Sequence, residues 1–95
     1  MAVEIEIGII SEEGLHARPA SVLVKSANCF KSDICIVYGH KKVNAKSILG
    51  VLSLGATKGS TIILRIEGED EQDAISFLRD LIGGRLNGDE QHTKI

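Results

Sequence analysis

The chain of 95 residues carries 11 Lys and Arg against 13 Asp and Glu, a net charge of −2 that argues against binding nucleic acid by bulk electrostatic attraction. Its length suits one domain with a modest core. No apolar run approaches the roughly 20 residues that span a bilayer, and the N-terminus lacks a signal-peptide pattern, so we expect a cytoplasmic protein without membrane insertion.

The first elements follow from two periodicities. Residues 3–9 alternate apolar side chains with Glu or Gly, which predicts a half-buried strand with a wet glutamate face. A loop over residues 11–14 leads into a predicted helix at about 17–28. Phe30 follows this helix and is expected to fill the core. The apolar positions of this helix are Ala20, Leu23, Val24 and Ala27.

Two strands and a short helix are predicted next. Residues 34–38 are rich in β-branched side chains, and a tight turn at 39–40 joins them to a short strand at 41–44 as a hairpin. Ser47 is a good N-cap for a short helix that runs to about Leu54. A fourth strand at 61–67 then follows the alternating pattern.

The last predicted helix follows an acidic start at 69–71, where negative charge meets the positive end of the helix dipole. Its apolar stripe consists of Ala74, Phe77, Leu78, Leu81 and Ile82. Gly83-Gly84 should end it, so we expect one domain over residues 1–84 and a mobile polar tail over 85–95.

The predicted order β-α-β-β-α-β-α indicates the α+β class. With right-handed crossovers it gives split βαβ topology, in which a four-stranded antiparallel sheet carries all three helices on one face. We therefore expect an open-faced β-sandwich.

The segment from Gly14 to Ala20 combines several groups that suit phosphate chemistry. Pro19 favours the first turn of a helix, so His16 should lie at the N-cap, with the N–H groups of Ala17 and Arg18 pointing outward as an anion site. A neutral imidazole can accept a phosphoryl group, and a guanidinium can bind phosphate oxygens. These residues predict a reversibly phosphorylated histidine. The alternatives are a histidine that only caps the helix and an arginine that is only a solvated surface charge.

Two segments resemble one protein family. Residues 14–20 are similar to the active-site segment of HPr, the histidine-containing phosphocarrier family of the bacterial sugar phosphotransferase system. Residues 42–55 (Lys-Val-Asn-Ala-Lys-Ser-Ile-Leu-Gly-Val-Leu-Ser-Leu-Gly) look like the regulatory serine region of that family. The resemblance covers roughly residues 2–82 and implies the same open-faced sandwich.

The resemblance also implies roles for individual residues. His16 would accept a phosphoryl group on Nδ1 from enzyme I and pass it to IIA domains of sugar permeases, and Arg18 would neutralise the arriving charge. The family members are carriers rather than enzymes. No cofactor or metal is implied within this chain, because magnesium and phosphoenolpyruvate belong to enzyme I. We expect a monomer.

Ser47 and the residues after it carry two compatible interpretations. As an N-cap, Ser47 would contribute about 1 kcal/mol to its helix. The resemblance implies phosphorylation there by HPr kinase/phosphorylase, with a catabolite-control transcription factor as a further partner. Ile48, Leu49 and Leu52 resemble the patch on which the family docks its partners, the alternative being that they complete the core.

The remaining chemistry-bearing residues form no motif. Cys29 and Cys35 match no metal spacing, so we expect them to be buried packing residues. His40 and His92 are expected at the surface.

Three rival functions are weaker. A regulatory paralogue acting through Ser47 alone would lack the active-site histidine, which this chain has as His16. An RNA-binding sandwich is opposed by the glutamates and the few aromatic residues of the predicted sheet face. A hydrolytic or metal enzyme would need a second catalytic group that the motif does not supply.

Overall fold

The structure is a computed structural model, and it describes residues 2–84. The predicted tail at 85–95, with His92, lies outside the described residues. The elements are β1 (Ala2–Gly8), α1 (Ala17–Ala27), β2 (Asp33–Tyr38), β3 (Lys41–Asn44), α2 (Ile48–Ser53), β4 (Thr61–Glu67) and α3 (Glu71–Gly83). This order confirms the predicted sequence of elements.

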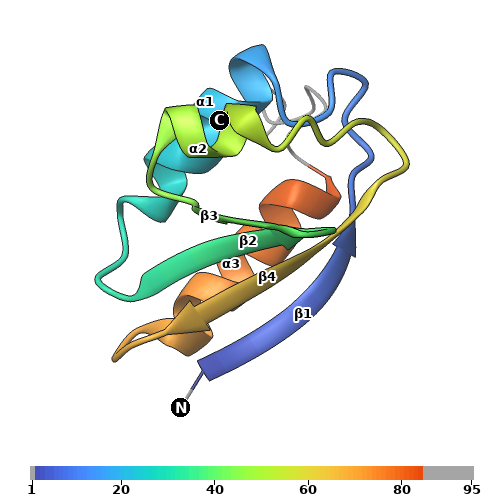
Figure 1. Cartoon of the computed structure of the whole chain (residues 1–95). Coiled ribbons are helices and arrows are strands. Elements are labelled where there is room, and N and C mark those ends of the chain that lie inside the picture. Colours follow the sequence, from blue (N-terminus) through green and yellow to red (C-terminus); the bar gives the residue numbers. More distant parts are fainter. Residues whose placement is uncertain (1, 85–95) are drawn as a thin grey trace.

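The four strands form one antiparallel sheet in the order β1-β4-β2-β3. Since β4 pairs with both β1 and β2, those two strands run parallel to each other without touching, as split βαβ topology requires. The helices lie on one side of the sheet, and the other side is open (Figure 1). The predicted fold class is confirmed. None of the described helices has both the length and the apolar character needed to cross a membrane.

The core lies between the sheet and the helices. Alternate strand residues point into it, because successive side chains of a strand face opposite sides. Each fully buried Leu or Ile contributes roughly 1.5–3 kcal/mol. The fully buried side chains include Ile36, Leu64 and Ile66 from the sheet and Leu23, Val51 and Leu78 from the helices.

Phe77 corrects the prediction for α3. The residue is 42% exposed, whereas Ala74, Leu78 and Ile82 of the same stripe are buried. Phe77 lies at the edge of the stripe, because the buried arc of α3 extends toward the opposite side, where Ile75 is partly buried against the core. Its ring packs instead against that of Phe30, with 5.9 Å between the centroids.

Both cysteines were expected to be buried, and neither is. Cys29 is exposed beyond the last turn of α1, and Cys35 is partly exposed. Cys35 points to the open face because its strand neighbours, Ile34 and Ile36, occupy the core side. Burial averages for a residue type do not say which side of the pleat that residue occupies.

Asp70 precedes α3 and joins two loops. Its side chain does not cap its own helix. It accepts hydrogen bonds from the backbone N–H of Lys31 (2.8 Å) and of Ser32 (3.0 Å), both in the loop after α1. The Ser32 hydroxyl, which is buried, donates a third. Asp70, from the acidic start predicted for this helix, therefore joins the segment before α3 to the loop before β2. This contact lies at the end of the sheet away from the start of α1 (Figure 1).

Candidate functional site

His16 is the N-cap of α1, as the position of Pro19 predicted. Its backbone is extended (φ −125°, ψ 168°), its residue is exposed, and its side chain makes no capping hydrogen bond. The imidazole is therefore not engaged as a substitute for a Ser or Asp cap. Within residues 2–84, neither ring nitrogen of His16 makes a hydrogen bond or ion pair, so both are available for chemistry.

The first two amides of α1 lie beside this histidine. Within residues 2–84, the N–H groups of Ala17 and Arg18 donate no hydrogen bond, and the first bond of the helix runs from Ala20 N to His16 O at 3.4 Å. Free amides at the positive end of a helix dipole favour an anion. This end of α1 has 11 helical residues behind it.

Ala17 has a backbone conformation that is rare for a residue with a side chain. Its φ is +51°, and it is the one non-glycine residue among those described with a positive φ. Such a conformation costs roughly 1–2 kcal/mol, because Cβ crowds the neighbouring carbonyl oxygen. Strain of this kind often lies at functional sites, where the surrounding structure holds it in place. No sequence pattern indicated it.

Arg18 completes the predicted trio of residues. Its residue is exposed, and its guanidinium makes no ion pair within the described part of the chain. Arg18 can therefore turn toward an anion bound at the helix start without breaking an existing contact. Three consecutive residues thus bring together an exposed imidazole, two backbone amides and a guanidinium that have no partner among residues 2–84.

The loop that carries His16 rests on the segment after α2. The Leu15 N–H donates to the Ala56 carbonyl oxygen at 2.9 Å, and both residues are fully buried. Gly14 lies against the same backbone. Ala56 and Thr57 were missed at the sequence level, because a tertiary backbone contact leaves no side-chain signal.

Ser47 is the N-cap of α2, as predicted. Its hydroxyl oxygen accepts a hydrogen bond from the Gly50 N–H at 3.1 Å. The residue before it is tied to α1: Lys46 Nζ donates to Phe30 O at 2.7 Å, and the Asn28 side chain donates to Lys46 O at 3.2 Å. These bonds hold the start of α2 against the far end of α1.

The three α2 residues predicted as a docking patch differ in exposure. Leu49 is 76% exposed and Ile48 is 41% exposed, so neither completes the core. Leu52 is partly buried and packs against the core. The helix lies beside α1, on the same side of the sheet as the His16 loop (Figure 1).

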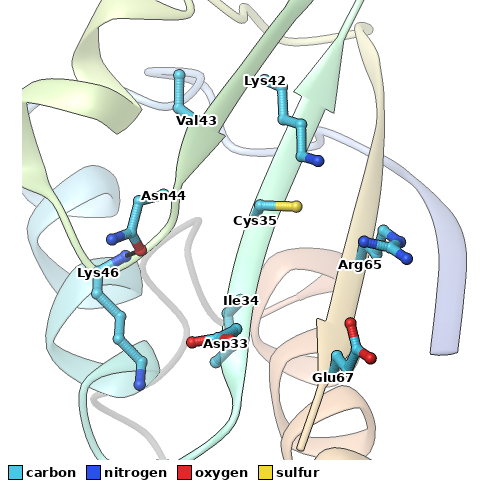
Figure 2. A pocket seen from close by; sticks show the side chains of 9 residues that line it. All are labelled: Asp33, Ile34, Cys35, Lys42, Val43, Asn44, Lys46, Arg65 and Glu67. Carbon is cyan, nitrogen blue, oxygen red and sulfur yellow. Dashed lines mark hydrogen bonds between the residues drawn. The ribbon is translucent and has the colours of Figure 1, made fainter. Parts of the chain in front are cut away.

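A hollow lies on the opposite, open face of the sheet. Figure 2 shows Cys35 within it, flanked by Lys42 and Arg65, with Asp33 and Glu67 toward the other end of the strands. Its lining includes none of the predicted site residues. His16, the predicted phosphoryl acceptor, lies at the exposed start of α1 and not in this hollow. Within the described residues, no group of His, Cys, Asp or Glu is arranged to hold a metal ion.

A family model and several solved structures match this chain over most of its length. The family model described as the phosphorylation site of the HPr component of the phosphotransferase system matches residues 3–83. HPr of Bacillus anthracis is 40% identical, with a TM-score of 0.83, over 85% of this chain and 96% of that one.

Two further structures are similar. An HPr of Thermoanaerobacter tengcongensis is 46% identical, with a TM-score of 0.86, over 88% of this chain and 94% of that one. Crh, a catabolite repression protein of Bacillus subtilis seen as a swapped dimer, is 41% identical, with a TM-score of 0.69, over 84% of this chain and 92% of that one. With the family match, these likenesses show that the chain belongs to the HPr family, the phosphocarriers of the phosphotransferase system.

Proposed function

We propose that this protein accepts a phosphoryl group on His16 from enzyme I and passes it to IIA domains of sugar permeases. The observation that carries the proposal is the exposed imidazole of His16, uncapped and adjacent to two free amides at the start of α1. The family supports the role of a carrier rather than a catalyst. We expect the protein to act in the cytoplasm as a monomer.

The transfer step requires one nitrogen lone pair and a cradle for negative charge. The lone pair of neutral Nδ1 of His16 forms a bond to phosphorus while the bond between phosphorus and the donor atom of enzyme I breaks. The electron pair of the broken bond stays with that donor atom, and the phosphoryl oxygens keep their charge throughout. The Ala17 and Arg18 amides and the Arg18 guanidinium offset that charge. Nδ1 is the ring nitrogen nearer the backbone, which favours it over Nε2 as the acceptor.

The open position of the site suits a carrier. A deep pocket that bound the phosphoryl group tightly would stabilise the loaded protein and slow the transfer from His16 to the next acceptor. His16, Ala17 and Arg18 are all exposed. The partner can therefore approach closely and supply the rest of the transfer site.

Ser47 provides a second, regulatory site in this proposal. Its hydroxyl oxygen already accepts a hydrogen bond from Gly50 N, and a phosphate there would add charge at the start of a helix, where it is tolerated. It would also lie beside the exposed Ile48 and Leu49, which we propose as the partner-docking patch together with Leu52. The similarity to Crh supports HPr kinase/phosphorylase and a catabolite-control transcription factor as further partners.

A chase experiment tests the carrier role. The protein is first loaded from phosphoenolpyruvate by enzyme I, enzyme I is removed, and an IIA domain is added. We expect the phosphate to move to the IIA domain from the native chain and from the control variant His40→Ala, since His40 is an exposed turn residue. His16→Ala should carry none. Phosphate that stays on the loaded chain would contradict the proposed transfer.

A further inference from the structure

We propose that Gly14 is a positioning residue for phosphoryl transfer, and that the backbone of Ala56 and Thr57 is the seat that fixes the His16 loop. This inference rests on the proposed function and concerns the geometry of the same site. Neither the seat nor the role of Gly14 is evident from the chemistry of the motif, because Gly14 and Ala56 carry no polar side chain and the seat consists of backbone atoms.

Gly14 leaves no room for a side chain. It is buried and has a φ of +65°. A Cβ built on it would collide with the Ala56 carbonyl oxygen and would lie 2.8 Å from Thr57 Cα. Both obstacles are backbone atoms, which cannot rotate away as the end of a flexible side chain can. Any residue other than glycine would therefore lift the loop off its seat.

The seat itself is held firmly. Thr57 N donates to Ser60 Oγ at 3.1 Å, and Ser60 N donates back to Thr57 O at 2.9 Å. The turn is also bound to the residue that follows β1. Ile9 N donates to Ser60 O and Gly59 N donates to Ile9 O, both at 2.8 Å. A collision at Gly14 would displace the loop rather than the seat.

His16 lies two residues from this contact. The Leu15 N–H to Ala56 O bond lies between them, and the buried Leu15 side chain holds the loop from below. Relieving the collision requires a shift on the order of 1 Å, and misplacement of a reacting group by that distance can cost about 100-fold in rate. The seat thereby fixes the orientation of the imidazole relative to the free amides of α1.

A matched pair of glycine variants tests the proposal. Gly14→Ala and Gly39→Ala both place a methyl group on a residue with similar backbone, at φ +65° and +62°, but a Cβ at Gly39 meets nothing within 4 Å. Both should lower the urea midpoint through backbone strain. The kinetics of phosphorylation by enzyme I with phosphoenolpyruvate are compared where both variants are folded.

We expect Gly14→Ala to lower kcat about tenfold or more with KM little changed, because the apolar surface of α2 is untouched. The NMR signals of the His16 ring should also shift in this variant. Gly39→Ala should match the native chain in kcat, KM and ring signals. Equal kcat values and ring signals in the two variants would overturn the proposal. Absence of phosphate on the native chain would refute the proposed function instead.

A second pair covers the case in which Gly14→Ala does not fold. Ala56 and Ala45 are both fully buried and lie on either side of α2. Ala56→Gly loosens the backbone of the seat, whereas Ala45→Gly removes an equivalent methyl group elsewhere. We expect slower transfer from Ala56→Gly alone. Equal transfer from both variants would overturn the proposal.

Discussion

Oδ1 of Asp70 accepts hydrogen bonds from both the hydroxyl (2.5 Å) and the backbone N–H (3.0 Å) of Ser32, which lies in the loop after α1. The Ser32 hydroxyl, followed by the Lys31 N–H, holds the pKa of the Asp70 carboxyl below its ordinary value. Gly68 packs so closely on Ser32 that a Cβ there would lie 2.6 Å from Ser32 Cα. The hydrogen bonds between Asp70 and Ser32 link the start of α3 to the loop after α1.

Stability should therefore depend on pH through Asp70. Because its pKa is lower in the folded protein, the unfolded chain binds the proton more readily, and stability rises with pH across this range. The contribution is complete above the ordinary pKa of an aspartate, about 3.9, and is lost as pH falls through the lower folded value. As the pH is lowered from 6 to 2.5, the urea midpoint should fall more steeply for the native chain than for Asp70→Asn.

Asp33→Asn is the control for this titration, because the Asp33 carboxylate makes no hydrogen bond or ion pair within residues 2–84. It should leave the pH dependence close to that of the native chain. A native curve as flat as that of Asp70→Asn would show that the Ser32 contact does not favour the charged carboxylate.

Removing the cap of α2 should weaken the fold. Ser47→Ala leaves the Gly50 N–H without its acceptor, which should cost about 1 kcal/mol in the free energy of unfolding. Ser47→Asp should lose less, because a carboxylate is also a good cap. Ser53→Ala is the matched control at the other end of the helix, where the hydroxyl donates to Gly50 O. Urea unfolding that ranks Ser53→Ala below Ser47→Ala would contradict this role.

Arg18 should affect transfer and leave stability nearly unchanged. Arg18→Ala removes a cation that makes no ion pair in the described chain, so we expect phosphorylation by enzyme I to slow on the order of 10- to 100-fold. Arg18→Lys should recover part of the rate, because it keeps the charge but not the paired donors. Arg79→Ala, at another exposed arginine, should transfer at the native rate. Equal rates for both alanine variants would exclude a phosphate-binding role for Arg18.

Leu49 tests the docking patch. At 76% exposure it contributes little to the core, so Leu49→Glu should leave the urea midpoint near that of the native chain. The same change should raise KM for enzyme I by about tenfold, because a charge would be buried in the interface. Leu49→Met keeps the apolar surface and should retain a native KM. If Leu49→Glu has the native KM, the patch lies outside the enzyme I interface.

The features that the sequence predicted best depend on a short, regular spacing of residues along the chain. β4 occupies 61–67 as expected, because every second residue of this strand is a large aliphatic side chain facing the core. The cap at Ser47 was predictable for a similar reason, since the hydroxyl and the Gly50 N–H are three residues apart. Both features depend on local geometry.

The misses depend on information from outside the local segment. The exposure of Phe77 follows from where α3 meets the sheet, and that of Cys35 from which side of β2 faces the helices. The positive φ of Ala17 and the seat at Ala56 are backbone features of the tertiary fold. The motif therefore predicts which residues carry the chemistry, but it does not indicate what holds them in position.

Whether His16 accepts the phosphoryl group can be read from the intact mass of the protein after incubation with enzyme I and phosphoenolpyruvate, for the native chain and for His16→Ala. We expect one acid-labile phosphate on the native chain and none on the variant. An unmodified native chain, or a variant that still gains a phosphate, would contradict the assignment of His16 as the phosphoryl acceptor.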